Sequence, residues 1–411
     1  MHTLFQRHTN HLSKRLSSSI ASLSSRDLNG IVASVSGDVV QVAGFNDARL
    51  FSLVTFARGA VGLITSLPRS GGARIILIRG PTPLAAETVV SESRAVALRG
   101  VNGGARFWAG RIVDAIGDPI DGRGTISNVS SSTTSSSKVK ISQNFGDDFA
   151  ALAGGGSTQV SRAASMGFRE IASGALALGH PALDSFAPLL RGRSLALLSG
   201  STNNTQDQLT QVAISASIAA SRLHKKAPLR VIWGTVGMSS SSVRKTAFAL
   251  KHLQPQPTIF AAPIGSSRAG ASALTHAAAI ALGEAVRDSG SDALVILEGC
   301  VASAQAIRLC GGEIEGGGVA SGGGGGGNAL GGIVSLPSLL DRASQMNADR
   351  GGGSLSIIAL IDAPPDSLGV ARDVRAAASL ADDCVELTST TSTTSSGGGG
   401  GAEFRKHVLG F

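Results

Sequence analysis

A glycine-led loop that could bind phosphate follows a short apolar run near the middle of the chain. The run Ser194–Ser199 (SLALLS) is typical of a buried strand. Loops between a strand and a helix bind nucleotides when they read G-x-x-x-x-G-K-[ST], because their backbone N–H groups surround the phosphates. In that motif the lysine contacts the β and γ phosphates, and the hydroxyl binds Mg²⁺. The positions here are Gly200, Ser201, Thr202, Asn203, Asn204, Thr205, Gln206 and Asp207.

The family resemblance given below implies this alignment of positions 200–207 with the motif, and three of the motif's fixed positions differ. Thr205 replaces the second glycine and adds a Cβ where the backbone needs conformational freedom. Gln206 replaces the lysine, and Asp207 replaces the hydroxyl residue. A carboxylate suits the positive end of a helix dipole, but it places negative charge where a phosphate would bind. Each electrostatic change could cost about a few kcal/mol, so we expect a loop that no longer binds ATP.

A second candidate site residue ends a later apolar strand. The run ALVIL at residues 293–297 is followed by Glu298 and Gly299. The family resemblance given below implies that the acidic end of this strand positions Mg²⁺ and its water. Glu298 is therefore a candidate metal ligand, and the alternative is a polar residue that ends a strand.

Other kinds of chemistry find little support. The eight histidines are scattered, and the three cysteines form no C-x-x-C pair, so no zinc site or disulfide framework is predicted. No G-x-S-x-G nucleophile elbow follows a strand. Aromatic residues make up 4% of the chain and tyrosine is absent, which argues against nucleic-acid binding. No stretch approaches the ~18 to 20 uninterrupted apolar residues of a membrane span.

The elements that must position these residues alternate between strand and helix after about residue 160. Such alternation predicts a parallel sheet covered by helices on both faces. The expected strands are 194–199, 229–236, 258–262, 293–297 and 355–361, and the expected helices are 209–220, 241–253, 271–287 and 336–347. Before them, residues 30–99 alternate short β-branched runs with glycine, which predicts a small β-barrel or sandwich.

Low-complexity blocks and the distribution of charge predict where the domains begin and end. Blocks rich in Ser, Thr or Gly at 127–137, 316–327 and 388–401 are expected to be loops. The net charge is +8, and four of the excess positive charges lie in residues 1–26, which are basic, serine-rich and free of acid. That composition predicts an organelle transit peptide. The expected plan is 1–26 transit peptide, 28–99 β-barrel, 100–165 linker with a Ser-rich insertion, 166–387 α/β domain with a degenerate nucleotide site, and 388–411 low-complexity tail.

Several segments resemble one known family. The turn-rich run GRIVDAIGDPIDGRG at 110–124 resembles the segment that joins the β-barrel to the nucleotide-binding domain in F-type ATP synthase α and β subunits. Residues 182–193 (ALDSFAPLLRGR) resemble the stretch before the phosphate-binding loop, and their Arg-Gly-Arg favours α. Residues 229–243, 293–299 and 336–360 also resemble family segments in the same order. The resemblance covers roughly residues 28–387.

The resemblance implies a fold and a function. The fold is a P-loop NTPase-like (RecA-like) α/β domain preceded by a small β-barrel, with the C-terminal helical domain largely absent. The function is that of a non-catalytic α-like subunit of a proton-translocating F-type ATP synthase, without catalytic activity of its own. Its partners would be the β subunit and other catalytic-head subunits, and its place the matrix side of the mitochondrial inner membrane, with the chloroplast as the alternative. No cofactor is expected, although ATP with Mg²⁺ is the alternative.

Three other functions stay open at this stage. The first is a regulatory α subunit that still binds nucleotide. The second is an assembly or accessory protein outside the ring, and the third is a decaying duplicate without a stable role. Nucleotide titration separates the first of these from the others, and isolation of bound partners separates the rest.

Overall fold

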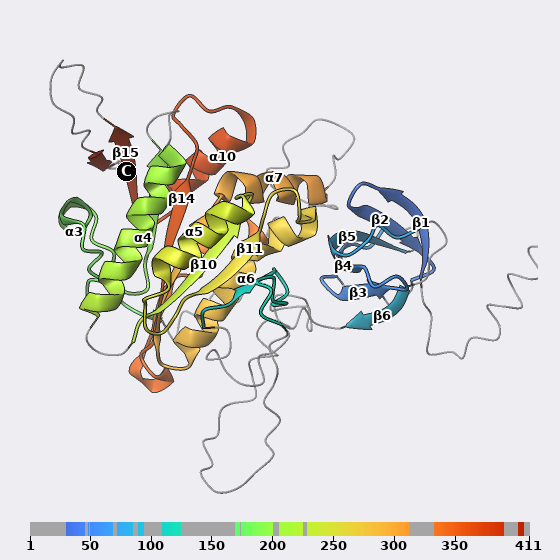
Figure 1. Ribbon diagram of the computed structural model, residues 1–411, viewed down its shortest axis with the longest axis horizontal. Coiled ribbons are helices and arrows are strands. Elements are labelled where there is room, and N and C mark those ends of the chain that lie inside the picture. Colours follow the sequence, from blue (N-terminus) through green and yellow to red (C-terminus); the bar gives the residue numbers. More distant parts are fainter. Residues whose placement is uncertain are drawn as a thin grey trace, which may run out of the picture.

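The computed structural model shows an antiparallel sheet beside a larger α/β domain (Figure 1). It describes residues 30–45, 48, 50–68, 72–84, 89–93, 109–124, 169–172, 174–199, 205–224, 228–311, 333–389 and 402–406. The expected transit peptide and the blocks at 127–137 and 316–327 therefore lie outside the described residues. The architecture confirms the expected fold class, an α/β domain preceded by a barrel-like β-sheet.

The first sheet has six antiparallel strands in the order β1-β2-β5-β4-β3-β6. Alternate residues along β2 and β3 are buried, as expected where one face of an antiparallel sheet covers a core, whereas β4 and β5 are buried along most of their length. The Val89 N–H donates to Gly30 O at 3.0 Å, which joins the start of β6 to the residue before β1. The strands are β1 (Ile31–Ser36), β2 (Val39–Ala43), β3 (Leu53–Phe56), β4 (Val61–Ser66), β5 (Ala73–Arg79) and β6 (Val89–Ser93).

The second sheet is parallel through its centre and has the order β16-β15-β9-β14-β12-β10-β11-β7, with β16 antiparallel to β15. Its central strands are buried on both faces, which explains their continuous apolar sequences. The strands are β7 (Ile112–Val113), β9 (Ser194–Ser199), β10 (Arg230–Val236), β11 (Thr258–Ala262), β12 (Asp292–Glu298), β14 (Ser354–Ile361), β15 (Asp383–Ser389) and β16 (Ala402–Lys406).

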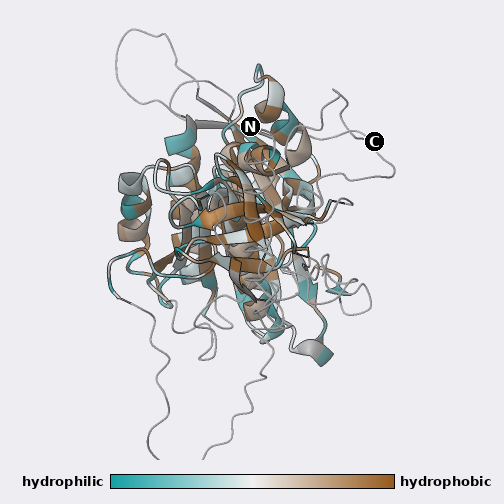
Figure 2. Cartoon of the chain, turned by 90° about the vertical axis from the view of Figure 1, so that its right-hand side faces the viewer, coloured by the Kyte–Doolittle hydropathy of each residue, from teal (hydrophilic) through white to brown (hydrophobic). Residues whose placement is uncertain are grey.

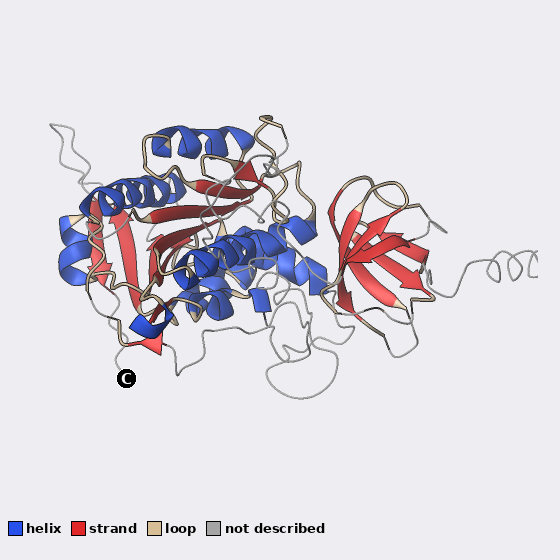
Figure 3. Ribbon diagram, turned by 90° about the horizontal axis from the view of Figure 1, so that it is seen from below, coloured by secondary structure: helices blue, strands red, loops and turns tan. Residues whose placement is uncertain are grey.

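Helices cover both faces of this sheet (Figure 3). Successive residues of β9 alternate between two cores, with Leu195 and Leu197 in one and Ala196 and Leu198 in the other. The first core contains residues of α3 (Pro181–Phe186), α4 (Thr205–Leu223) and α5 (Ser240–Leu250). The second contains residues of α6 (Ala269–Asp288), α7 (Cys300–Gly311), α9 (Leu336–Leu340) and α10 (Gly369–Ala378). Figure 2 shows the most hydrophobic segments inside these layers.

The expected helix over 336–347 is wrong beyond its first turn and a half. The helix α9 ends at Leu340, and Ser344–Met346 forms β13, which pairs antiparallel with β14 and with β8 (Arg169–Glu170). A short 3-10 helix, η4 (Ala348–Arg350), and a glycine turn connect β13 to β14. The hydrogen bonds that β13 forms with β14 and with the distant strand β8 therefore outweigh the local helical pattern of these residues. The strand β16 also lies in the segment expected to be a tail, and the sequence did not predict it.

The barrel-like sheet contacts the α/β domain at the start of α6. Arg268, the residue before α6, has no capping side chain of its own. Instead Asp38, in the turn between β1 and β2, accepts a hydrogen bond of 2.8 Å from the Ala269 N–H and pairs with the Arg268 guanidinium at 2.8 Å. A Cβ added to Gly270 would lie 2.6 Å from Leu77 O, so the two domains approach closely here. The first sheet thus caps the helix that it packs against.

The helix α6 is long and apolar enough, by length and composition, to cross a membrane. Most of this stretch is buried inside the fold, between the parallel sheet, α7 and β5. Core helices of globular proteins pass the same test, and burial on every side is what an all-round apolar helix requires. Its sequence is therefore explained by its central place in the fold.

Candidate nucleotide-binding site

The candidate site residues lie at the carboxyl edge of the parallel sheet. The helix α4 begins shortly after β9, Glu298 ends β12, and Asp362 follows β14, the strand between them. In open α/β sheets, ligands bind in the crevice at this edge. Residues 200–204 of the loop lie outside the described residues, as does the side chain of Thr205. The structure therefore places Gln206, Asp207 and Glu298 of the sequence-predicted site.

The two described side chains of the loop motif lie in the first turn of α4. The Gln206 Nε2 donates a hydrogen bond to the sulfur of Met238 at 2.9 Å. Met238 lies two residues after the end of β10, so this amide contacts the loop that follows β10. Asp207 is exposed. Its negative charge stabilises the N-terminal end of α4 through the helix dipole, at the end where a phosphate would otherwise accept backbone hydrogen bonds.

Glu298 is buried, with 5% of its surface exposed. Its Oε1 accepts a hydrogen bond of 2.6 Å from the Thr210 hydroxyl of α4. Its Oε2 accepts one of 2.9 Å from the Trp233 indole N–H of β10. The register between β10 and β12 explains the second contact, because Thr235 lies opposite Glu298 and Trp233 is two residues earlier on the same face.

This arrangement satisfies the Glu298 carboxylate with protein donors. Each Glu298 oxygen uses one of its lone pairs for a hydrogen bond, so a metal ion would have to share the carboxylate with Thr210 and Trp233. In the part of the chain that the structure describes, no group of three His, Cys, Asp or Glu side chains could hold a metal ion. The geometry favours the interpretation of Glu298 as a buried polar strand end.

The backbone of Glu298 also has a buried partner. The imidazole Nε2 of His276, on α6, lies 2.9 Å from Glu298 O. Burial lowers the pKa of His276 to about 4, although hydrogen bonds to the carbonyls of Glu298 and Gly234 oppose the shift. The ring is therefore neutral near pH 7 and adds no positive charge to the site.

A second carboxylate lies beside Glu298. Burial raises the pKa of Asp362, and the negative charge of Glu298 raises it further. The nearby Cys300 thiol is buried, and its pKa is raised by burial and by the charges of Asp362 and Glu298. The thiol is thus protonated, and the negative charge of Glu298 disfavours a phosphate beside it.

Among the described residues at this edge, Arg375 carries a positive charge, and it already has partners. The Nη1 of Arg375, on α10, donates to Ser199 O at 2.8 Å and to Ala363 O at 2.7 Å. Its Nη2 pairs with Glu386 at 3.0 Å. This arginine binds the strand ends together rather than facing an open site. Sequence reasoning missed Arg375, Thr210, Trp233 and Asp362, since their roles depend on contacts between distant elements and no local motif marks them.

Comparison with known proteins adds a family likeness. No family model matches the chain. It is 27% identical to the ATP synthase subunit alpha of Dichelobacter nodosus over 68% of this chain and 47% of that protein. It is 26% identical to the subunit of Marinobacter nauticus over 78% and 54%, and 25% identical to that of Neisseria gonorrhoeae over 68% and 47%. The chain thus spans about half the length of the curated relatives it matches.

These relatives correct one expectation. They come from bacteria, and this contradicts the mitochondrial location predicted from residues 1–26. A basic, serine-rich composition alone does not define a cellular location, because polar terminal segments that are not targeting signals can have the same composition. The matches support the resemblance found in the sequence, that of a strongly diverged chain similar to ATP synthase α subunits.

Proposed function

We propose that this chain is a non-catalytic, α-like subunit of a proton-translocating ATP synthase, and that residues 200–207 no longer bind Mg-ATP. The observation that carries the proposal is the Glu298 carboxylate, whose two oxygens accept hydrogen bonds from Thr210 and Trp233. A Mg²⁺ ion would have to compete with both donors. The role that remains is to pack beside other subunits.

The charges around the loop support the same conclusion. Gln206 carries no charge where the nucleotide-binding motif has a lysine, and Asp207 adds a negative charge in the first turn of α4. The carboxylates of Glu298 and Asp362 lie at the same edge, while Arg375 is paired with Glu386. A triphosphate would meet repulsion here without the cation that offsets it.

A calorimetric titration tests the ligand part of this proposal. The intact chain is titrated with Mg-ATP, and the matched variant carries the three substitutions Thr205→Gly, Gln206→Lys and Asp207→Thr, which recreate the nucleotide-binding motif. We expect no saturable binding by the wild-type chain up to about 1 mM and at least about tenfold higher affinity in the variant. Micromolar binding by the wild-type chain would instead favour a nucleotide-binding regulatory subunit.

Co-expression with an ATP synthase β subunit tests the partner part. The proposed partners are the β subunit and the other catalytic-head subunits, because the relatives are ATP synthase α subunits. Native mass spectrometry of the purified chain should detect a mixed complex that contains both proteins. A chain that stays monomeric beside excess β subunit contradicts the proposal. Binding to β without entry into a closed ring would favour an assembly protein.

A further inference from the structure

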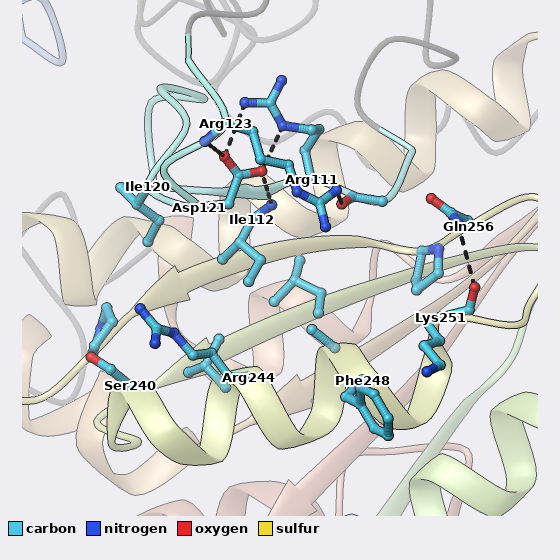
Figure 4. Close-up of a pocket in the computed structure, with 16 residues that line it drawn as sticks. Arg111, Ile112, Ile120, Asp121, Arg123, Ser240, Arg244, Phe248, Lys251 and Gln256 are labelled. Atoms are coloured by element: carbon cyan, nitrogen blue, oxygen red, sulfur yellow. Dashed lines mark hydrogen bonds and ion pairs between the residues drawn. The ribbon is translucent and has the colours of Figure 1, made fainter.

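A pocket with a volume of about 420 Å³ lies between the turn-rich run 109–124 and α5. Figure 4 shows the two walls, with Arg111 and Arg123 on the run, Arg244 and Phe248 on α5, and Lys251 directly after α5. None of the candidate nucleotide-site residues lines this pocket. Its size is in the range of small-molecule sites.

The lining of the pocket is strongly basic. Four cationic side chains, namely Arg111, Arg123, Arg244 and Lys251, face one carboxylate, that of Asp121. The pocket also has an apolar floor, which is made of Ile112 on the run, Val243 and Ala247 on α5, and Pro257 and Ile259 beside and on β11. Cationic groups around an apolar floor attract anions more strongly than the same groups in open water, because the floor lowers the local dielectric.

The Asp121 carboxylate is occupied by Arg111 and by backbone groups of its own turn. Arg111 binds Asp121 in a two-pronged ion pair, with Nε–Oδ2 at 2.6 Å and Nη2–Oδ1 at 3.0 Å. The backbone N–H groups of Arg123 and Ile112 also donate hydrogen bonds to the Asp121 carboxylate. Burial alone would raise the pKa of Asp121, but these hydrogen bonds, with that of Arg111 foremost, lower it to about 2. Asp121 is thus committed to Arg111 and to the backbone of its own turn.

Three cations remain without a carboxylate among the residues that the structure describes. Arg123 Nη1 donates to Gly110 O at 3.1 Å, which orients its guanidinium at the pocket wall. Arg244 is exposed on α5, and no described acid pairs with it. The Lys251 ammonium lies 3.6 Å from the centre of the Phe248 ring, a cation–π contact that leaves its charge uncompensated.

We propose that this pocket binds a small molecule that carries a diphosphate group. Arginine guanidinium groups match phosphate oxygens in pairs, and lysine adds a point charge. The cations stand on both walls, so a ligand with two anionic centres can contact both walls at once. The apolar floor accommodates carbon atoms attached to the diphosphate. This inference goes beyond the proposed function and does not depend on it.

Calorimetric titration of the intact chain with pyrophosphate, in magnesium-free buffer of low ionic strength, tests the proposal. We expect saturable binding below about 1 mM. Arg244→Gln and Lys251→Gln should each weaken it at least about fivefold, since both side chains are exposed and their replacement leaves the core intact. The matched control is Arg222→Gln, which removes one exposed cation from α4, away from the pocket lining.

The outcomes distinguish free pyrophosphate from a diphosphate ester as the ligand, and they include results that would overturn the proposal. Orthophosphate should bind at least about tenfold more weakly than pyrophosphate. Tighter binding of ADP than of pyrophosphate would identify a larger diphosphate ester as the source, and the reverse order would identify the free inorganic anion. Absence of saturable pyrophosphate binding, or binding that Arg222→Gln weakens as much as Arg244→Gln, would overturn the proposal. Neither result bears on Mg-ATP binding at residues 200–207.

Discussion

The indole N–H of Trp233 lies 2.9 Å from Oε2 of Glu298, across two neighbouring parallel strands. A tryptophan on β10 thereby satisfies a carboxylate at the edge of the sheet where a metal ion could otherwise bind. Thr210 satisfies the other oxygen, and His276 contacts the carbonyl of the same residue. Glu298 links β10, β12 and α4. Its contacts therefore stabilise the fold and also limit the access of a metal ion to the carboxylate.

Trp233→Phe should destabilise the protein by about 2 kcal/mol, because it leaves a buried carboxylate oxygen without its donor. Urea unfolding measures the change in free energy. The control is the same substitution in a Glu298→Gln background, where the buried group is no longer charged and the cost should be smaller. Equal costs in the two backgrounds would show that the negative charge of Glu298 adds nothing to the strength of its hydrogen bond with Trp233.

Asp38→Ala should cost about 1 kcal/mol, since it removes the group that caps α6 from the neighbouring sheet. Asp38→Asn is the matched variant, because an amide oxygen still accepts from the Ala269 N–H while the charge opposite Arg268 is lost. The Asn variant should therefore lie closer to wild type in thermal unfolding. If the Asn variant loses as much stability as the Ala variant, the ion pair and not the cap would be the stabilising contact.

Much of the α/β domain could be predicted from the sequence, because its strands are short apolar runs with clear boundaries. The run TIFAA gave the strand Thr258–Ala262, with both ends as the structure has them. The strand Ser344–Met346 could not be predicted, since its residues pair with Ser354 and Leu355 across a turn and their own pattern fits a helix. Local pattern determines an element only where no distant partner competes for its backbone hydrogen bonds.

The candidate site was less predictable than the fold. The place of Glu298 at the end of a strand follows from its apolar run, but the donors that satisfy it do not. Trp233 faces Glu298 only because β10 and β12 pair in one register, and Thr210 only because α4 covers that face. Register and helix placement are tertiary properties, and they decide whether a carboxylate is a ligand or a buried partner.

Arg191→Lys should cost about 2 kcal/mol. Arg191 Nη2 contacts Asp292 Oδ1 at 2.6 Å and Gly352 O at 3.2 Å, and Ser354 donates to the same carboxylate. Burial would raise the pKa of Asp292, but hydrogen bonds from Arg191 and Ser354 hold it below its ordinary value. A lysine cannot reproduce the planar guanidinium that joins carboxylate and carbonyl.

The second arginine of the same Arg-Gly-Arg sequence provides the control for this prediction. Arg193 pairs with Asp382, and both side chains are more exposed than those of Arg191 and Asp292. Solvent weakens such a pair, so Arg193→Lys should change the free energy of unfolding by less than about 1 kcal/mol. Urea unfolding of both variants measures the difference. Equal losses would mean that the burial of Asp292 does not strengthen its contact with Arg191.

His276 should make stability fall as the pH falls from about 6.5 to about 4. Burial lowers the pKa of this imidazole in the folded state from 6.5 to about 4, while the unfolded chain keeps the ordinary value. Over that interval the unfolded state binds a proton that the folded state does not, so acid favours unfolding. The stabilisation is fully present above pH ~6.5 and is lost progressively below it, by about 1.4 kcal/mol per pH unit and about 3 kcal/mol in all.

Urea unfolding at several pH values between about 7 and 5 measures this slope. His276→Gln should flatten it, because the amide can still donate to Glu298 O but does not titrate. The exposed His252, changed in the same way, is the control and should leave the slope as in wild type. The fully buried position of the ring between α6 and the end of β12 is what produces the effect, so a variant at His276 with the wild-type slope would show that the imidazole is accessible to protons without unfolding.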